Sequence, residues 1–415
     1  MEQQFDELSL KITSELAKEV KKNEGIYFTP KTIINKMMNT FINYVDTNEL
    51  NIERILEPSC GSCEFVKVLD NLFEDTIIDC YETNSIIYNK IVNLHFSSNK
   101  VNIFNEDFLK KEVNENTKYD LIVGNPPYFV IKRTQVPKEY DKYVCGRPNI
   151  FTLFIIHSLQ QLKQKGILMF VIPKSFLNSY YYSEVRNYIK QTCKIICIQD
   201  YESNNDFIDT EQATFGLILQ KLETEYETVL DCEPCPYSLR INGDFIFSPE
   251  AEKLSTYFEG ATTLKDLGIE VKTGTIVWNE KKDLLTNSKD ATLLLYNTNV
   301  TKDNKLELTE FKNASKFQRI NSEGNVEPMI VVNRGNGNSK YVFKYALVDL
   351  KEPYLVENHL NMVYTKLALS NKDKMELYEK VIESFKDERT HEFIKLYFGN
   401  GGMSKTELES VLPIY

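Results

Sequence analysis

Short apolar runs alternate with segments of helical periodicity through the first half of the chain. Four of these runs predict buried strands, at residues 52–56, 76–81, 101–104 and 119–123. Apolar residues recur at helical spacing over residues 31–45 and in the stretch that ends at Leu72. Strands that alternate with helices are typical of an α/β fold with a doubly wound, mostly parallel sheet.

The same pattern continues to about residue 221. Residues 148–165 predict an amphipathic helix, and residues 167–172 and 193–200 predict two further strands. At the N-terminus, residues 5–22 predict one docking helix. Thr29 and Pro30 are expected to be the N-cap and the first residue of the helix over residues 31–45.

A proline-punctuated segment, Cys232-Glu-Pro-Cys-Pro236, predicts a connection between two domains at about residues 222–245. A chain of 415 residues is long for a single core, which also favours two domains. We therefore expect one domain over residues 1–235 and a second, mixed α/β domain over residues 246–415. Within the second, helices are expected over residues 358–397 and 406–412.

Composition excludes some classes of protein. The chain has no run of about 18 uncharged apolar residues, and its N-terminus is charged. These two observations predict neither a membrane span nor secretion. We expect a cytoplasmic protein. Its net charge of −11 argues against a generally basic protein that coats DNA, although a local basic cleft is compatible with it.

One segment departs from the acidic balance. Residues 312–344 hold six basic and two acidic residues, which makes them a candidate for phosphate contact, with a solvated loop as the ordinary alternative. Arg334 lies among glycines and asparagines, where small neighbours would let a guanidinium approach a guanine edge. Lys340 and Lys344 follow as candidate phosphate contacts.

The eight cysteines include two Cys-x-x-Cys pairs, Cys60/Cys63 and Cys232/Cys235. Four thiolates at such spacing could hold zinc. The first pair lies inside a loop with another use, and no cysteine or histidine cluster surrounds the second. We therefore expect reduced, packed thiols and no metal.

The strand at residues 119–123 leads almost directly into Asn125-Pro126-Pro127-Tyr128. Because proline cannot donate to a strand ladder, the two prolines end the strand and stiffen the loop. Asn125 then stands at the carboxyl edge of the sheet, where open α/β folds bind ligands. Its amide oxygen, the Pro126 carbonyl and the face of Tyr128 would together grip a planar base that bears an amino group.

The preceding strands also end in polar groups. The first is followed by a small-residue loop, Glu57-Pro58-Ser-Cys-Gly61-Ser-Cys63, whose backbone a ligand can approach closely. Glu82 stands 21 residues beyond Gly61, where doubly wound folds place an acceptor for ribose hydroxyls. After the third strand, Asp107-Phe108 could bond an adenine amino group and cover its ring.

Over residues 25–221, these motifs in this order resemble those of the γ-class N6-adenine-specific DNA methyltransferases of type II restriction-modification systems. The resemblance implies a Rossmann-like methyltransferase fold, and it makes Phe207 a second aromatic against the target base, opposite Tyr128. It implies S-adenosyl-L-methionine as cofactor, held by Tyr27, Thr29, Pro30, Glu57, Pro58, Gly61, Glu82, Asp107, Phe108 and Asn125. Cys63 departs from the family, which usually has a glycine there, and cysteine adopts positive φ less freely.

The resemblance also implies the reaction, which is methyl transfer to N6 of an adenine flipped out of duplex DNA. Residues 246–415 would be the target-recognition domain. Double-stranded DNA and a cognate restriction endonuclease are the expected partners of a monomeric enzyme. Two alternatives stay open: an RNA or protein-glutamine methyltransferase with the same tetrapeptide, and a non-catalytic DNA specificity module.

Overall fold

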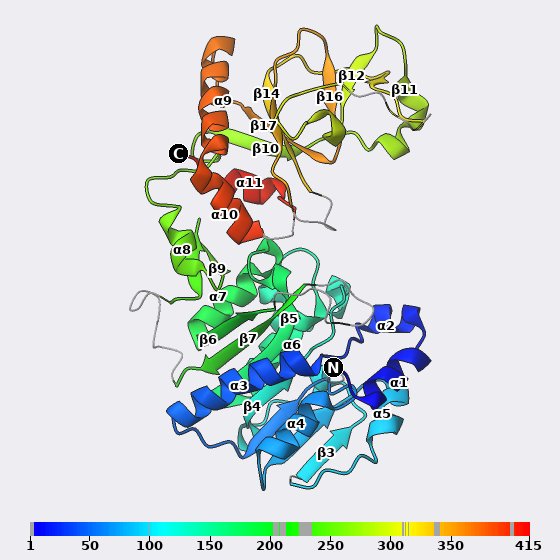
Figure 1. Ribbon diagram of the computed structural model, residues 1–415, viewed down its shortest axis with the longest axis vertical. Helices are drawn as coiled ribbons and strands as arrows, with labels where there is room; N and C mark the ends of the chain where they lie inside the picture. The colour runs from blue at the N-terminus through cyan, green and yellow to red at the C-terminus, as the bar shows by residue number, and fades with distance from the viewer. Residues whose placement is uncertain are drawn as a thin grey trace. The chain divides into compact units, whose positions relative to one another are not determined.

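The structure is a computed structural model that describes residues 4–98, 100–201, 207, 213–223, 235–308, 311, 313, 315–335, 341–398 and 402–415. The chain divides into two compact units, Met1–Ala251 and Glu252–Tyr415 (Figure 1). The division lies later than the connection expected at residues 222–245. The hairpin of β8 (Ser238–Ile241) and β9 (Asp244–Phe247) belongs to the first unit, since the Phe247 N–H donates to the Leu177 carbonyl at 2.8 Å.

The first unit is built on a seven-stranded sheet of order β3-β2-β1-β4-β5-β7-β6. Strands β1 to β5 pair in parallel, and β7 is antiparallel to both of its neighbours. All six strands predicted in this part of the chain are present, and β7 is the one that the apolar pattern did not predict. The strands are β1 (Arg54–Glu57), β2 (Ile77–Tyr81), β3 (Lys100–Phe104), β4 (Tyr119–Gly124), β5 (Leu162–Pro173), β6 (Cys193–Asp200) and β7 (Thr214–Lys221).

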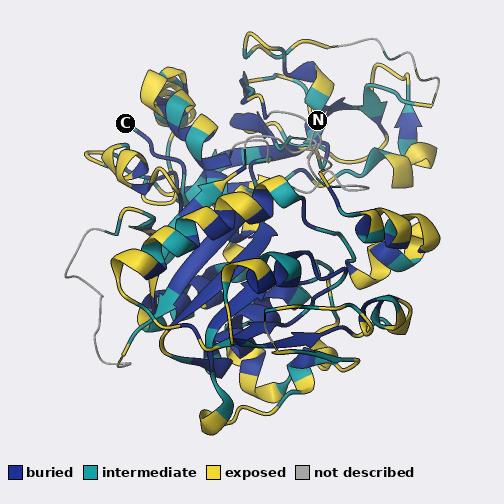
Figure 2. Ribbon diagram, turned by 60° about the horizontal axis from the view of Figure 1, so that its bottom comes forward, coloured by how far each residue is buried: buried dark blue, intermediate teal, exposed yellow. Residues whose placement is uncertain are grey.

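Two apolar clusters cover the two faces of this sheet. Along β4, Leu121 and Val123 belong to one cluster and Ile122 to the other, as the alternation of side chains in a strand requires. Figure 2 shows the strands buried and the outer sides of the helices exposed. The first cluster includes residues of α3 (Lys31–Thr47), α4 (Glu64–Leu72) and α5 (Ser85–Ile91), and the second includes residues of α6 (Ile150–Gln161) and α7 (Ser183–Thr192). The predicted doubly wound α/β fold is therefore confirmed.

The N-terminal segment differs from its prediction. Residues 5–22 form two helices, α1 (Glu7–Glu15) and α2 (Lys18–Glu24), because Leu16 and Ala17 are extended with ψ of 130° and 141°. The predicted cap of α3 is also wrong. Pro30 is extended, with ψ of 143°, and precedes the helix as its N-cap position, so Thr29 lies one residue too early to cap it. The Lys31 N–H donates instead to the Gln4 carbonyl at 3.0 Å.

The second unit holds two four-stranded sheets, which agrees with a mixed α/β composition. One has the order β10-β17-β14-β15 and the other β11-β13-β12-β16. The strands of the first are β10 (Ile269–Thr273), β17 (Leu360–Thr365), β14 (Met329–Asn333) and β15 (Tyr345–Val348). Those of the second are β11 (Leu285–Thr286), β13 (Arg319–Ile320), β12 (Thr292–Leu295) and β16 (Tyr354–Val356).

The helices of the second unit are α9 (Asn371–Lys386), α10 (Glu388–Phe398) and α11 (Lys405–Ser410), and α8 (Ala251–Thr256) spans the division. The prediction of helix from residue 358 is wrong at its start. Residues 360–365 form β17, which is paired on both sides by β10 and β14, so strand pairing overrides local preference there. The predicted last helix, over residues 406–412, is present as α11.

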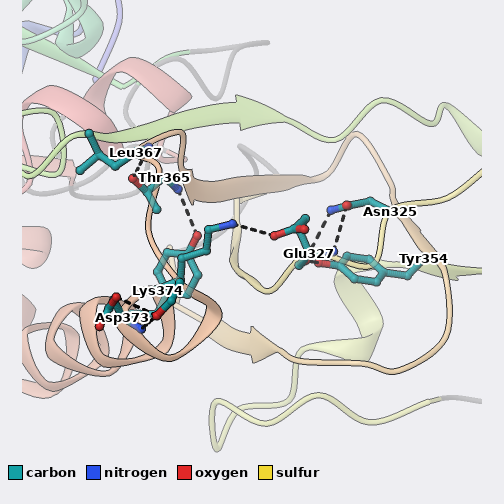
Figure 3. Close-up of polar contacts among 9 residues, drawn as sticks. Asn325, Glu327, Tyr354, Thr365, Leu367, Asp373 and Lys374 are labelled. Carbon is teal, nitrogen blue, oxygen red and sulfur yellow. Dashed lines mark hydrogen bonds and ion pairs between the residues drawn. The ribbon is translucent and has the colours of Figure 1, made fainter.

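Helix α9 is bonded to its sheet by side chains that Figure 3 shows. Lys374 Nζ lies 2.7 Å from Glu327 Oε2, and the Thr365 N–H donates to the Tyr378 hydroxyl at 3.0 Å. Among the described residues of both units, no helix is long and apolar enough to cross a membrane.

Candidate active site

A pocket opens where the strand order of the first sheet reverses, between the carboxyl ends of β1 and β4. Open α/β sheets bind ligands at this position because the loops that leave neighbouring strands diverge there. Eight of the residues predicted to hold the cofactor line it, namely Tyr27, Thr29, Glu57, Pro58, Gly61, Glu82, Phe108 and Asn125. Pro127 of the predicted catalytic motif lines it as well.

Several lining residues were not predicted. Phe28, Tyr81 and Phe154 contribute aromatic side chains to the wall. Tyr81 is the last residue of β2, so its position at a strand end was a signal that could have identified it. Nothing in the sequence singled out Phe154, which comes to the pocket because α6 packs behind the loop of Phe108, with 5.6 Å between the two ring centroids.

Glu57 gives the pocket a buried carboxylate. Its side chain is 2% exposed, and its Oε2 has no hydrogen-bond partner among the described residues. Burial raises the pKa of Glu57 well above its usual value, and the nearby carboxylates of Glu82 and Glu64 raise it further. A buried polar atom without a partner is costly, so this oxygen is suited to a donor or a cation brought by a ligand.

Glu82 is held at the end of β2 by two backbone donors. Its carboxylate accepts from the Gly61 N–H at 3.1 Å and from the Asn84 N–H at 2.7 Å. Burial nevertheless raises its pKa to about 7. Since an ionised carboxylate offers about four acceptor positions, capacity remains for ribose hydroxyls.

The loop between β1 and α4 has a cysteine in a conformation that favours glycine. Cys63 adopts the left-handed conformation, with φ of 63°, directly before α4, and its side chain is buried. The pKa of Cys63 lies well above its usual value. The larger cause is a hydrogen bond with Cys60, and burial is the second. A side chain at position 61 would crowd the pocket wall, because a Cβ on Gly61 would lie 3.1 Å from the Phe28 ring. Cys232, of the other Cys-x-x-Cys pair, lies outside the described residues.

Asn125 is fixed on three sides. Its Nδ2 donates to the Tyr27 carbonyl at 2.9 Å, and its own carbonyl accepts from Ser59 Oγ at 3.1 Å. Its Oδ1 accepts from the Tyr128 hydroxyl, which also lies 2.6 Å from the Val171 carbonyl. A carbonyl can only accept, so the Tyr27 oxygen sets which end of the Asn125 amide carries the acceptor. Burial raises the pKa of Tyr128 well above its usual value, so its hydroxyl stays protonated.

The two predicted aromatic partners of the base lie in different clusters. Tyr128 is half-buried and packs against the second cluster, with its ring 6.1 Å from Phe151 in an edge-on arrangement. Phe207 is half-buried and packs against the first cluster. The sandwich of a base between the two rings stays a prediction.

Asp107 and Phe108 follow β3 as predicted. Phe108 is buried and packs against Tyr81 and His157, with ring centroids 5.9 and 4.7 Å away. Asp107 Oδ1 accepts from the Leu109 N–H at 3.0 Å, its Oδ2 lies 3.8 Å from Lys110 Nζ, and its side chain is 38% exposed, so a ligand can reach it. Asp107, Pro30, Pro126 and Tyr128 adjoin lining residues in the chain but are not themselves part of the lining.

The residues expected to contact DNA lie in the second unit, around the connection between β14 and β15. Arg334 Nη1 donates to the Asn358 carbonyl at 3.0 Å, and Lys344 Nζ donates to the Val300 carbonyl at 3.0 Å. Burial lowers the pKa of Lys344. Lys340 lies outside the described residues. Two of the three side chains are thus already bonded within their own unit, which no pattern in the chain indicated.

The pocket fits a cationic nucleoside such as S-adenosylmethionine. The unpaired Oε2 of Glu57 supplies an acceptor for a cationic or donor group of the ligand, and Glu82 supplies acceptors for ribose hydroxyls. Phe108 and Tyr81 offer an apolar wall for the adenine. The small-residue loop at Gly61 lets the ligand approach the backbone.

Comparison with known proteins supports the same family. Residues 65–207 match the Eco57I restriction-modification methylase family model. The chain is 26% identical over 417 residues to the type II methyltransferase M.CvrRI of Paramecium bursaria Chlorella virus XZ-6E, with 99% of each chain covered. It is 31% identical over 219 residues to the modification methylase CviBIII of Paramecium bursaria Chlorella virus NC1A, covering 52% of this chain and 55% of that protein.

Among solved structures, the DrdV–DNA complex aligns with a TM-score of 0.50 at 13% identity, over 94% of this chain and 55% of that one. At this identity the likeness concerns the fold alone. The chain spans about half the length of CviBIII and of the DrdV chain. These matches confirm the predicted resemblance to restriction-modification methyltransferases and the expected cofactor, and they leave the modified base undecided.

Proposed function

We propose that this chain, whose first unit carries the Eco57I restriction-modification methylase match, is a DNA methyltransferase that modifies N6 of adenine in a specific duplex sequence. The single observation that carries the proposal is the Asn125 carboxamide. It lies at the carboxyl end of β4, lines the pocket beside Glu57 and Gly61, and is oriented by the Tyr27 carbonyl.

When bound, S-adenosylmethionine supplies a methyl group on a positively charged sulfur. Glu82 and Asp107 would hold its ribose and adenine, with Phe108 against the ring. Thr29 and Glu57 would adjoin its methionine end. These contacts position the methyl donor, and positioning of two reactants is itself worth a large part of a transfer barrier.

The residues around Asn125 would activate the acceptor. The amino nitrogen of adenine is a weak nucleophile because its lone pair is delocalised into the ring. Asn125 Oδ1 and the Pro126 carbonyl, as acceptors for the amino hydrogens, would stabilise the positive charge that develops as the new bond forms. The Tyr128 hydroxyl has a second acceptor, Val171 O at 2.6 Å, so it can give up Asn125 Oδ1 to an arriving base without losing its own bond.

Adenine is inside the duplex in B-form DNA, so it must be flipped out to reach this site. Flipping costs a few kcal/mol, which stacking on Tyr128 would offset. Residues 1–235 would then serve as the catalytic domain and residues 246–415 as the target-recognition domain, because bases other than the flipped one must be read at their edges.

The test is to incubate the purified protein with S-adenosylmethionine and, in parallel, with plasmid DNA, total RNA and protein extract. Modified positions in each would then be mapped. N6-methyladenine at one recurring DNA sequence is expected, and Asn125→Ala should nearly abolish it even at saturating S-adenosylmethionine. Methylation of cytosine, or of RNA or protein alone, would contradict the proposal.

A further inference from the structure

A basic loop follows the Asn125 motif directly. Residues 129–147 carry five basic side chains and two acidic ones, in a chain whose net charge is −11. All five cations are exposed, namely Lys132, Arg133, Lys138, Lys142 and Arg147. The catalytic unit therefore has its own positive segment at the carboxyl edge of the sheet, where the pocket opens.

Arg133 and Asp141 shape this loop. Arg133 Nε and Nη2 lie 3.0 and 3.1 Å from the two Asp141 oxygens, in a bidentate pair. Within the described part of the chain, Arg133 is the only one of the five cations with a carboxylate partner. Pairing Arg133 with Asp141 leaves four cations against one acid, Glu139, so the excess of positive charge survives on Lys132, Lys138, Lys142 and Arg147.

The loop is also anchored at its base and in its middle. The Ile131 N–H donates to the Pro148 carbonyl and the Ile150 N–H to the Phe129 carbonyl, each at 3.0 Å. In η4 (Lys138–Tyr143), the buried Tyr140 hydroxyl lies 2.6 Å from His157 Nδ1 and 2.9 Å from Gln160 Oε1. The cations are thus held on an ordered surface, so binding there would cost little ordering entropy.

Exposed aromatic side chains lie beside this loop. The turn η6 (Tyr180–Tyr182) follows β5, which is the parallel neighbour of β4, and Tyr180 and Tyr181 are each 55% exposed. Tyr181 covers Gly146 of the loop so closely that a Cβ there would lie 2.5 Å from its ring. On the inner side, Tyr182 contacts Phe151 at 5.1 Å between ring centroids, and Phe151 contacts Tyr128.

We propose that residues 129–147 and Tyr180–Tyr182, together the strand cradle, bind the DNA strand that carries the target base next to the catalytic motif. This inference rests on the proposed function and adds a DNA surface in the catalytic unit to the one expected in residues 246–415. Lys132, Lys138 and Lys142 contact phosphates on either side of the flipped nucleotide. Tyr180 and Tyr181 pack against the sugars and bases of its neighbours. Proteins that hold unpaired strands combine basic side chains, which contact the phosphates, with aromatic side chains, on which the bases stack.

Salt dependence of binding tests the lysines. The triple variant Lys132→Ala/Lys138→Ala/Lys142→Ala should lower the slope of log K against log salt by about 2 to 3, because each phosphate contact contributes about 0.9. The matched control is Lys11→Ala/Lys36→Ala/Lys194→Ala, which removes the same charge from exposed positions on α1, α3 and β6. The control should keep the wild-type slope, and both proteins should bind S-adenosylmethionine normally by calorimetry.

A second measurement tests the tyrosines with single-stranded oligothymidylate. Tyr180→Ala/Tyr181→Ala should bind it about tenfold or more weakly, while Tyr180→Phe/Tyr181→Phe should bind it as the wild type does, because stacking needs only the ring. Equal slopes for the loop and control variants, or unchanged oligothymidylate binding by the alanine pair, would overturn the cradle. If wild-type protein binds DNA through these residues yet methylates none, the proposed function fails and the cradle stands.

Discussion

Binding of S-adenosylmethionine should weaken at acid pH because of one residue, Glu82. Burial raises its pKa from 4.5 to about 7 in the free protein. Ribose hydroxyls would donate to the ionised carboxylate, so binding favours the deprotonated form. With a pKa of about 7, the ionised fraction falls about tenfold between pH 8 and pH 6, and the dissociation constant should rise by about the same factor.

The raised pKa of Glu82 also determines how the stability of the folded protein changes with pH. The ionised form is the one penalised by burial, so Glu82 disfavours folding progressively as pH rises from 4.5 to about 7. A rise from 4.5 to about 7 corresponds to about 3 kcal/mol at full ionisation. Bound cofactor should recover part of this cost, so the gain in melting temperature on adding it should be larger at pH 8 than at pH 6.

The assay is calorimetric titration of S-adenosylmethionine at pH values from 6 to 8, for the wild type and for Glu82→Gln. The ratio of their dissociation constants cancels the titration of the ligand's own amino group. The glutamine side chain of the variant cannot ionise, so the wild-type dissociation constant divided by that of the variant should rise about tenfold from pH 8 to pH 6. A wild-type pH dependence no steeper than that of Glu82→Gln would refute the assignment to Glu82.

Three further predictions concern the other site residues. Tyr128→Phe should reduce turnover less than Tyr128→Ala, because it keeps the stacking face; equal losses in single-turnover assays would mean that the hydroxyl, bonded to Val171 O, matters more than the ring. Asp107→Ala should weaken cofactor binding about tenfold by calorimetry, and unchanged affinity would remove it from the adenine site. Arg334→Ala should relax preference at one base position at a cost of about 1–3 kcal/mol if the guanidinium leaves the Asn358 carbonyl to read guanine. If the variant instead keeps its site preference and only melts earlier, Arg334 is a structural residue.

Local pattern was a good guide to the parallel strands of the first unit and a poorer guide to the limits of helices in both units. Buried parallel strands are continuous apolar runs, and their carboxyl ends must meet at one edge, so Glu57, Glu82 and Asn125 could be brought together from sequence. The errors arose where distant contacts decide the outcome. Residues 360–365 became β17 because β10 and β14 pair with it, and the N-terminal helix broke at Leu16 and Ala17.

The amino-acid sequence by itself determined which polar groups follow each strand, the stiff Asn125 motif and the family resemblance. Each of these depends on residues close together in the chain. Only the tertiary structure decided the state of those groups. Glu82 acquires its pKa of about 7 from burial, and Asn125 takes its orientation from Tyr27, 98 residues away. Burial and hydrogen bonding between distant segments exist only once the chain is folded, and they set the chemistry of a site whose residues the sequence had already supplied.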